Sequence, residues 1–176
     1  MGNIICLKSN PENIQEGLKG SLKMSNGATS VFINVLCLSG GRLAETESQK
    51  RIMVFLAEKN QYICGIGTVD FDIDEMPWDK TSFDEDKAFM LRVIYGAKQK
   101  LGWETLSYEP DEVYLFKCLN TFQKLIERMT IDDIIELSLT EWLADSNEND
   151  PVKCGFPKCK IHNTYISVHG CQVCTD

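Results

Sequence analysis

Histidine is absent from the first 161 residues of this 176-residue chain. It is the side chain that most readily moves protons near neutral pH, and serine or cysteine nucleophiles usually depend on it as a base. Residues 1–161 therefore lack the catalytic base of a histidine-dependent hydrolase or transferase. We expect a protein that is not an enzyme of this kind.

Long apolar runs and a secretory leader are also missing. No apolar segment approaches the roughly 20 residues needed to span a bilayer. Residues 1–6 lack the charged and apolar regions of a signal peptide. The cysteines before the tail, Cys6, Cys37, Cys64 and Cys118, are widely separated among apolar residues, as reduced core thiols are. These features indicate a cytoplasmic protein without membrane contact.

Positive charge is scarce and unevenly placed. The chain has 18 basic and 26 acidic residues, a net charge of −8. Residues 151–176 carry a net charge of +2, whereas residues 1–150 hold 15 basic and 25 acidic side chains, a net charge of −10. Such a body repels nucleic acid and anionic membranes and attracts basic proteins. A basic protein is therefore the expected partner, and nucleic acid is not.

The first half of the sequence is rich in segments that favour β-structure. β-Branched and aromatic residues dominate several of them, and glycines or polar turns separate them. Strands are predicted over residues 3–7, 29–38, 51–57 and 61–73, the last two joined as a hairpin by the turn 58–60, and a four-residue apolar repeat predicts a helix over 11–24.

The second half changes to helical periodicity. Ser82 and Glu85 form a capping-box pattern before a helix that ends at Gly102. A second helix is predicted from 110 to 129 and a third after a cap at 130–133, with a short edge strand over 103–109. The sum is an α+β fold: an antiparallel sheet of about three to five strands packed by three to four helices. Residues 1–145 are expected to form one domain and residues 146–176 a linker and a C-terminal zinc-knuckle tail.

Two closely spaced ligand pairs in the tail predict a zinc site. Cys159-x-x-His162 and Cys171-x-x-Cys174 each place two donors on one tight turn, and Gly170 provides permissive backbone before the second pair. Four protein ligands fill a tetrahedral shell, which is typical of a structural zinc and not of a catalytic one.

Other assignments of the tail remain open from the sequence. An alternative set combines Cys154 and Cys159 with Cys171 and Cys174, which leaves His162 free. His169 is an alternate ligand, more naturally a neighbour of the site. The four thiols could also be ordinary buried cysteines without a metal.

An acidic stretch in the middle of the chain is the candidate partner-binding surface. Residues 70–86 hold eight acids against one base, and residues 132–150 hold seven acids without lysine or arginine. Strand alternation would place Asp70, Asp72 and Asp74 on one face. The expected contact surface consists of Asp70, Asp72, Asp74, Glu75, Trp78 and Asp79. A merely solubilising face and a core position for Trp78 are the plainer interpretations.

These observations favour a small acidic interaction protein with a structural zinc. A bacterial immunity or inhibitor protein that binds a basic nuclease toxin would fit the size and charge. One alternative is a nucleic-acid accessory or regulatory protein that uses the lysines of the zinc tail, Lys153, Lys158 and Lys160. Another is a metal-dependent hydrolase built from carboxylates.

Overall fold

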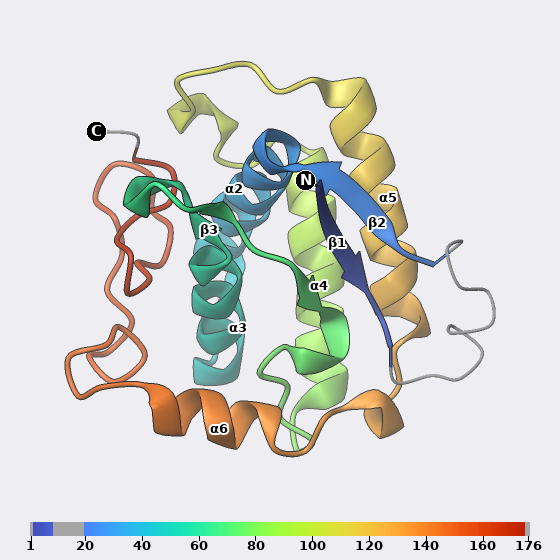
Figure 1. Cartoon of the computed structure of the whole chain (residues 1–176), viewed down its shortest axis with the longest axis vertical. Helices are drawn as coiled ribbons and strands as arrows, with labels where there is room; N and C mark the ends of the chain where they lie inside the picture. Colours follow the sequence, from blue (N-terminus) through green and yellow to red (C-terminus); the bar gives the residue numbers. More distant parts are fainter. Residues whose placement is uncertain (1, 9–19, 175–176) are drawn as a thin grey trace.

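The fold combines five α-helices with two small sheets in the part of the chain that the computed structural model describes, residues 2–8 and 20–174 (Figure 1). The helices are α2 (Asn26–Leu43), α3 (Glu47–Glu58), α4 (Phe83–Lys98), α5 (Glu112–Arg128) and α6 (Ser138–Asp145). The strands are β1 (Gly2–Cys6), β2 (Leu22–Ser25), β3 (Asn60–Gln61), β4 (Gly67–Thr68) and β5 (Phe71–Asp72). The expected α+β class is confirmed.

Helix α2 lies at the centre of the molecule, where a strand was predicted for residues 29–38. It packs against α3, α4 and α5 and against strands of both sheets. Residues 32–41 are all buried, so the helix is apolar around its whole circumference and shows no helical period. Ser25 caps it by accepting a hydrogen bond from the amide of Ala28. The strand prediction was wrong because a helix that is buried on every side has a continuous apolar sequence, and a buried strand has the same pattern.

The predicted hairpin of residues 51–73 is also wrong. Residues 51–57 belong to α3, which a capping box between Thr46 and Gln49 opens. Residues 61–73 contain the end of β3, the short strands β4 and β5, the 3-10 turn Tyr62–Cys64 and the first residue of another, Ile73–Glu75. β3 pairs with β4 as a separate two-stranded sheet.

The main sheet is mixed and has the order β2-β1-β5. β1 pairs antiparallel with β2 and parallel with β5, so the prediction of an antiparallel sheet was wrong in this respect. The strand predicted at 3–7 corresponds to β1. Of the helix predicted over 11–24, residues 11–19 lie outside the described part, and residues 22–24 belong to β2 instead.

The first two helices of the second half follow their predicted positions, whereas the cap at residues 130–133 opens a 3-10 turn and the third helix, α6, begins only at Ser138. α4 and α5 bury one apolar face each, including Phe89 and Phe122, which are fully covered. Ser82 makes no capping bond to the α4 backbone; its hydroxyl donates to Asp86 instead. The edge strand expected at 103–109 is replaced by a 3-10 turn, Trp103–Thr105. Within the described ranges, no helix is both long and apolar enough to cross a membrane.

The C-terminal segment folds back along the central helix. Figure 1 shows residues 155–174 running beside α2 and α3. Tyr165 belongs to the main hydrophobic core, and Leu38 of α2 packs with Cys171 and Val173. The segment therefore shares its core with the body of the protein.

Candidate metal centre

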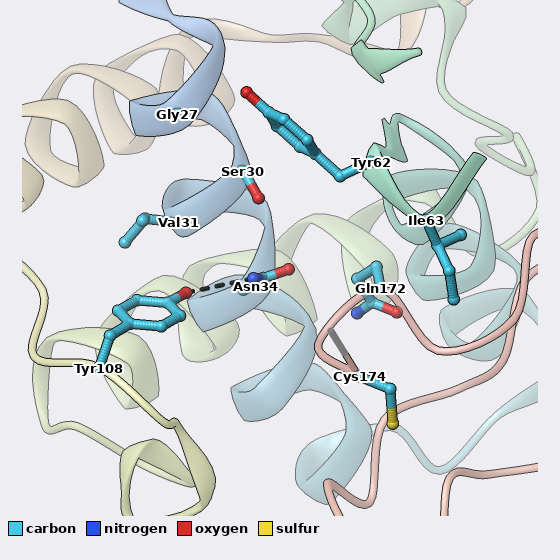
Figure 2. A pocket seen from close by; sticks show the side chains of 9 residues that line it. All are labelled: Gly27, Ser30, Val31, Asn34, Tyr62, Ile63, Tyr108, Gln172 and Cys174. Atoms are coloured by element: carbon cyan, nitrogen blue, oxygen red, sulfur yellow. Dashed lines mark hydrogen bonds between the residues drawn. The ribbon is translucent and has the colours of Figure 1, made fainter. Parts of the chain in front are cut away.

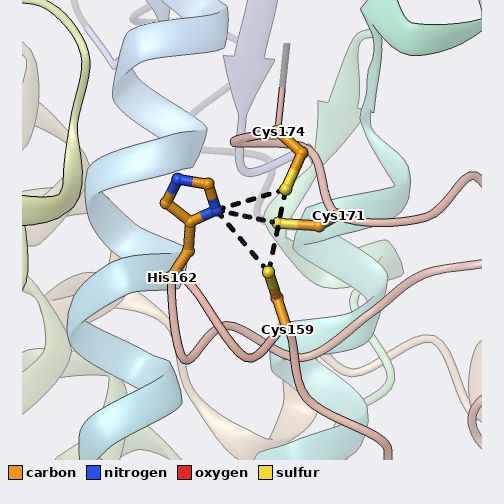
Figure 3. Close-up of side chains that lie close together, drawn as sticks. All are labelled: Cys159, His162, Cys171 and Cys174. Atoms are coloured by element: carbon orange, nitrogen blue, oxygen red, sulfur yellow. Dashed lines mark hydrogen bonds between the residues drawn. The ribbon is translucent and has the colours of Figure 1, made fainter. Parts of the chain in front are cut away.

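Four side chains of the C-terminal segment converge on one point. They are Cys159, His162, Cys171 and Cys174, and their donor atoms all lie within 4.8 Å of one another. Figure 3 shows the three sulfur atoms facing the Nδ1 atom of His162. The ligand set favoured by the sequence is therefore the one that the structure brings together.

Four of the six distances between these donors are close to the edges of a tetrahedral shell. His162 Nδ1 lies 3.6 Å from Cys159 Sγ, 3.5 Å from Cys171 Sγ and 3.4 Å from Cys174 Sγ. The sulfurs of Cys159 and Cys174 are 3.7 Å apart. A tetrahedron with metal–sulfur bonds of about 2.3 Å and a metal–nitrogen bond of about 2.05 Å has edges of about 3.8 and about 3.6 Å. The four residues are close enough to hold one metal ion.

Two tight backbone turns hold the ligands in this arrangement. The amide of Asn163 donates to Cys159 O, and the amide of Cys174 donates to Cys171 O. Asn163 and Gly170 have positive φ angles of 56° and 91°. Such angles cost little for glycine and are tolerated by asparagine, which explains the place of these residues beside the two ligand pairs.

The surroundings favour a thiolate at Cys159 and a neutral thiol at Cys174. Burial raises the pKa of Cys159, but the amides of His162 and Ile161 donate to its sulfur and bring the pKa down to about 6. Burial and the neighbouring thiols raise the pKa of Cys174 to about 12. The hydroxyl of Thr164 lies 3.3 Å from Cys171 Sγ. Without a cation, only some of the three thiols are ionised. A bound metal ion would stabilise the remaining thiolates, so the cluster is suited to bind a metal ion.

Comparison with known proteins gives no family assignment. No protein-family model matches the chain, and neither a curated protein nor a solved structure shows significant similarity to it.

The two alternate ligands lie away from the cluster. Cys154 is exposed, and its thiol donates to the carbonyl oxygen of Glu148 at 3.4 Å. His169 places its Nδ1 atom 3.5 Å from the sulfur of the exposed Cys64. The alternative ligand set, with Cys154 in place of His162, is therefore wrong. The thiol of Cys154 bonds to Glu148 O, and Cys154 is not part of the cluster. The pairing of Cys64 with His169 had no signal in the sequence, since 105 residues separate them.

The end of α2 anchors the first ligand pair. Arg42 donates to the carbonyl oxygen of His162 at 3.0 Å and to that of Leu38 at 2.9 Å. Gly41 leaves room for the backbone of the tail: a Cβ atom there would lie 2.2 Å from Asn163 O. These supports were not recognised in the sequence, where residues 39–41 looked like a strand-ending turn.

The three alternating aspartates were expected on one exposed face of a strand, but all three contact the N-terminal segment, at Ile4, Cys6 and Lys8. Asp70 accepts from the amide of Ile4 at 2.8 Å, and Asp74 accepts from the amide of Lys8 at 3.3 Å. Asp72 pairs with Lys8 Nζ at 2.6 Å. Asp72 and Asp74 are buried, and burial raises the pKa of Asp74. Their carboxylates thus hold the N-terminal strand.

Trp78 is a core residue and not a surface anchor. It is 2% exposed, its indole donates to Ile73 O at 2.7 Å, and its ring packs edge-on to Phe83. Asp79 is half-buried and accepts from the amide and hydroxyl of Thr81. Of the six expected contact residues, Asp70 and Glu75 are the exposed ones.

Proposed function

We propose that this protein is a non-catalytic binding protein that captures a basic protein partner, with a structural zinc ion holding its C-terminal segment. The observation that carries the proposal is a group of exposed apolar side chains at the start of the second acidic stretch of the chain. It consists of Ile131, Ile135 and Leu137, which are 45%, 40% and 60% exposed.

Acidic residues alternate with these apolar residues along the sequence, and one of them, Glu136, pairs with Lys80 at 3.6 Å. Asp132 and Glu136 lie between them in sequence and are exposed. The amide of Ile135 donates to Asp74 O at 3.4 Å, which brings the exposed Glu75 beside the same segment. We call Glu75 and residues 131–137 the acidic surface; residues 131–137 lie along the lower edge of Figure 1, before α6.

Charge and apolar area suggest what would cover this surface. Apolar side chains rimmed by polar ones typically mark a protein interaction site. A rim of carboxylates accelerates the approach of a basic protein and disfavours an acidic one. A nuclease toxin, which must itself bind an anionic polymer, is a basic protein of the required kind. An immunity or inhibitor role is the corresponding proposal for this chain.

Zinc is the metal that the donor set fits best. Three cysteine sulfurs and one imidazole nitrogen form a ligand set typical of structural zinc, and they occupy all four tetrahedral positions. All eight cysteines are free thiols, which suits a reducing compartment such as the cytoplasm.

The two alternative functions have less support. Lys158 Nζ donates to Gly41 O and Lys153 Nζ to Ser146 O, so two of the three tail lysines are engaged within the chain. Asp70, Asp72 and Asp74 hold β1 through hydrogen bonds. Neither the lysines of the tail nor these aspartates form a surface as open as the acidic one.

Site-specific photo-crosslinking tests the proposal. A photoreactive amino acid at Leu137 should crosslink, in cells that produce the full chain, to a protein with an isoelectric point above neutrality. The same group at Tyr95, which is 66% exposed on α4, serves as the control. Crosslinks to acidic proteins only, or equal crosslinking at both positions, would contradict the proposal.

Association kinetics with the crosslinked partner give the second test. Replacing Asp132 and Glu136 together by lysine should lower the association rate constant by about tenfold or more at low ionic strength. Added salt should reduce the rate for the unaltered protein more than for the variant. An association rate that is insensitive to both changes would rule out an acidic docking surface.

A further inference from the structure

A cavity of about 500 Å³ lies beside the metal centre. Its wall is formed by the first turns of α2, by the 3-10 turn that begins at Tyr62, by Tyr108 and by the tail between Gln172 and Cys174 (Figure 2). Small-molecule sites typically measure about 300–1,000 Å³. The metal ligand Cys174 belongs to the wall, so the metal centre fixes one side of the cavity.

The wall is mainly apolar and aromatic. Tyr62 and Ile63 approach from one side of α2 and Tyr108 from the other (Figure 2). Val31 of the helix lies on the same side as Tyr108. Among the described residues that line the cavity, none is charged. A flat, uncharged group fits such a wall better than an ionic one.

Two hydroxyl groups of the wall are set to donate. Asn60 donates to Ser30 Oγ at 2.9 Å and to Asn34 Oδ1 at 3.0 Å. Asn34 in turn donates to Tyr108 Oη at 3.2 Å. Because the hydroxyls of Ser30 and Tyr108 accept these bonds, their own protons remain available for an acceptor on a ligand.

Gln172 provides a buried carboxamide at the wall. The side chain is 7% exposed, and neither its Oε1 nor its Nε2 atom has a hydrogen-bond partner of good geometry. Its polar neighbour in the core is the thiol of Cys37, which is a weak donor and acceptor. Leaving such a group unpaired costs about 1–3 kcal/mol. Pairing with a ligand would require the amide to turn from Cys37 toward the cavity by rotation about its terminal side-chain bonds.

We propose that this cavity binds a planar, uncharged nitrogen heterocycle of the nucleobase type. The ring would stack against Tyr62, because aromatic side chains bind bases through their faces. Its edge, with a donor beside an acceptor, would pair with the carboxamide of Gln172, which offers the complementary pair. Ser30 and Tyr108 would donate to the remaining acceptors. This proposal is independent of the acidic surface.

Titration of the zinc-loaded protein with nucleosides tests the inference. Adenosine, guanosine, cytidine and uridine are added to the full chain, and amide signals of Ser30, Asn34, Tyr62 and Gln172 are followed by NMR. At least one nucleoside should shift these signals saturably at micromolar to millimolar concentration, and D-ribose should not. The proposal is overturned if no nucleoside binds or if ribose produces the same shifts.

Variants locate the binding site. Tyr62→Ala removes an aromatic side chain that is 48% exposed, so the fold should survive, and binding should weaken on the order of tenfold. Gln172→Leu keeps the volume and removes the amide, with a loss of similar size. Gln99→Leu, an exposed site outside the cavity wall, is the matched control.

Zinc content is measured for each variant, because Gln172 lies between two metal ligands. If Gln172→Leu keeps its zinc, unchanged nucleoside binding overturns the proposal. If that variant loses its zinc, Tyr62→Ala decides alone: a weakening supports the proposal, and wild-type affinity overturns it.

Discussion

Arg42 of α2 donates a hydrogen bond to the carbonyl oxygen of His162, a residue 120 positions further along the chain. The same guanidinium group holds Leu38 O and pairs with Glu104 at 3.4 Å. The ligand turn is thereby fixed to the central helix. A metal ion bound at His162 would share this attachment, so metal affinity and tail docking should be coupled.

Replacing Arg42 by methionine should therefore weaken zinc binding. The change keeps much of the aliphatic stem and removes every hydrogen bond of the guanidinium group. Loss of groups that orient a metal ligand typically costs about 10- to 100-fold in affinity. Competition with a chromophoric chelator measures the zinc dissociation constant. Arg92→Met, at an exposed position of α4, is the control and should leave it unchanged.

Removing one ligand should abolish stoichiometric zinc binding. Cys159→Ser is expected to lose the ion, because the remaining three donors no longer close the shell. Cys154→Ser changes an exposed thiol of the same tail and should retain one zinc per chain. Elemental analysis of the purified proteins measures the ratio. Equal zinc content in the two variants would contradict the proposed ligand set.

Two glycines of α2 should respond to alanine in opposite ways. At Gly41 a Cβ atom would lie 2.2 Å from Asn163 O and 3.1 Å from Thr164 Cα. Overpacking of this kind costs about 1–3 kcal/mol. At Gly27 a Cβ atom meets nothing within 4 Å, so the higher helix propensity of alanine should add up to about 1 kcal/mol.

Urea unfolding of both glycine variants measures these changes. In the Gly41→Ala protein, the NMR signals of the tail should also move, because the clash is with the tail backbone. If Gly41→Ala is as stable as the unaltered protein, the tail does not pack on α2 as described.

The predictable parts of the fold are those whose pattern is local. α4 and α5 each bury one face, so their periodicity marks them. α2 has no exposed face over residues 32–41, and its pattern cannot be told from that of a buried strand. The apolar run itself covers residues 29–38, a length that strands also reach, so its length did not separate the two structures either.

The candidate metal site was predictable for the same reason. Each ligand pair lies on a single turn, so the spacing alone brings its two donors together. The role of Asp72 and Asp74 depends on β1, 66 residues earlier in the chain. Their alternation looked like a charged outer face because the sequence does not show which strand pairs beside them.

The buried carboxyl group of Asp86 should make stability depend on pH. Asp86 is fully covered, and burial raises the pKa of its carboxyl group above the usual 3.8, although Ser48 and Ser82 donate to it. Between the ordinary and the raised pKa, the folded state binds more protons than the unfolded state. The contribution of Asp86 to stability is therefore present at low pH and is lost as pH rises through the raised pKa.

Asp86→Asn isolates this contribution, because asparagine can still accept from both serines and does not ionise. As the pH rises from about 4 to 7, the unfolding free energy of Asp86→Asn should increase relative to that of the unaltered protein. Urea unfolding at several pH values measures it, and release of metal at low pH affects both proteins alike. Asp84→Asn, at an exposed carboxyl of the same helical turn, is the control. If instead the unfolding free energy of the unaltered protein increases relative to that of the variant as the pH rises, folding lowers the pKa of Asp86 and the prediction is wrong.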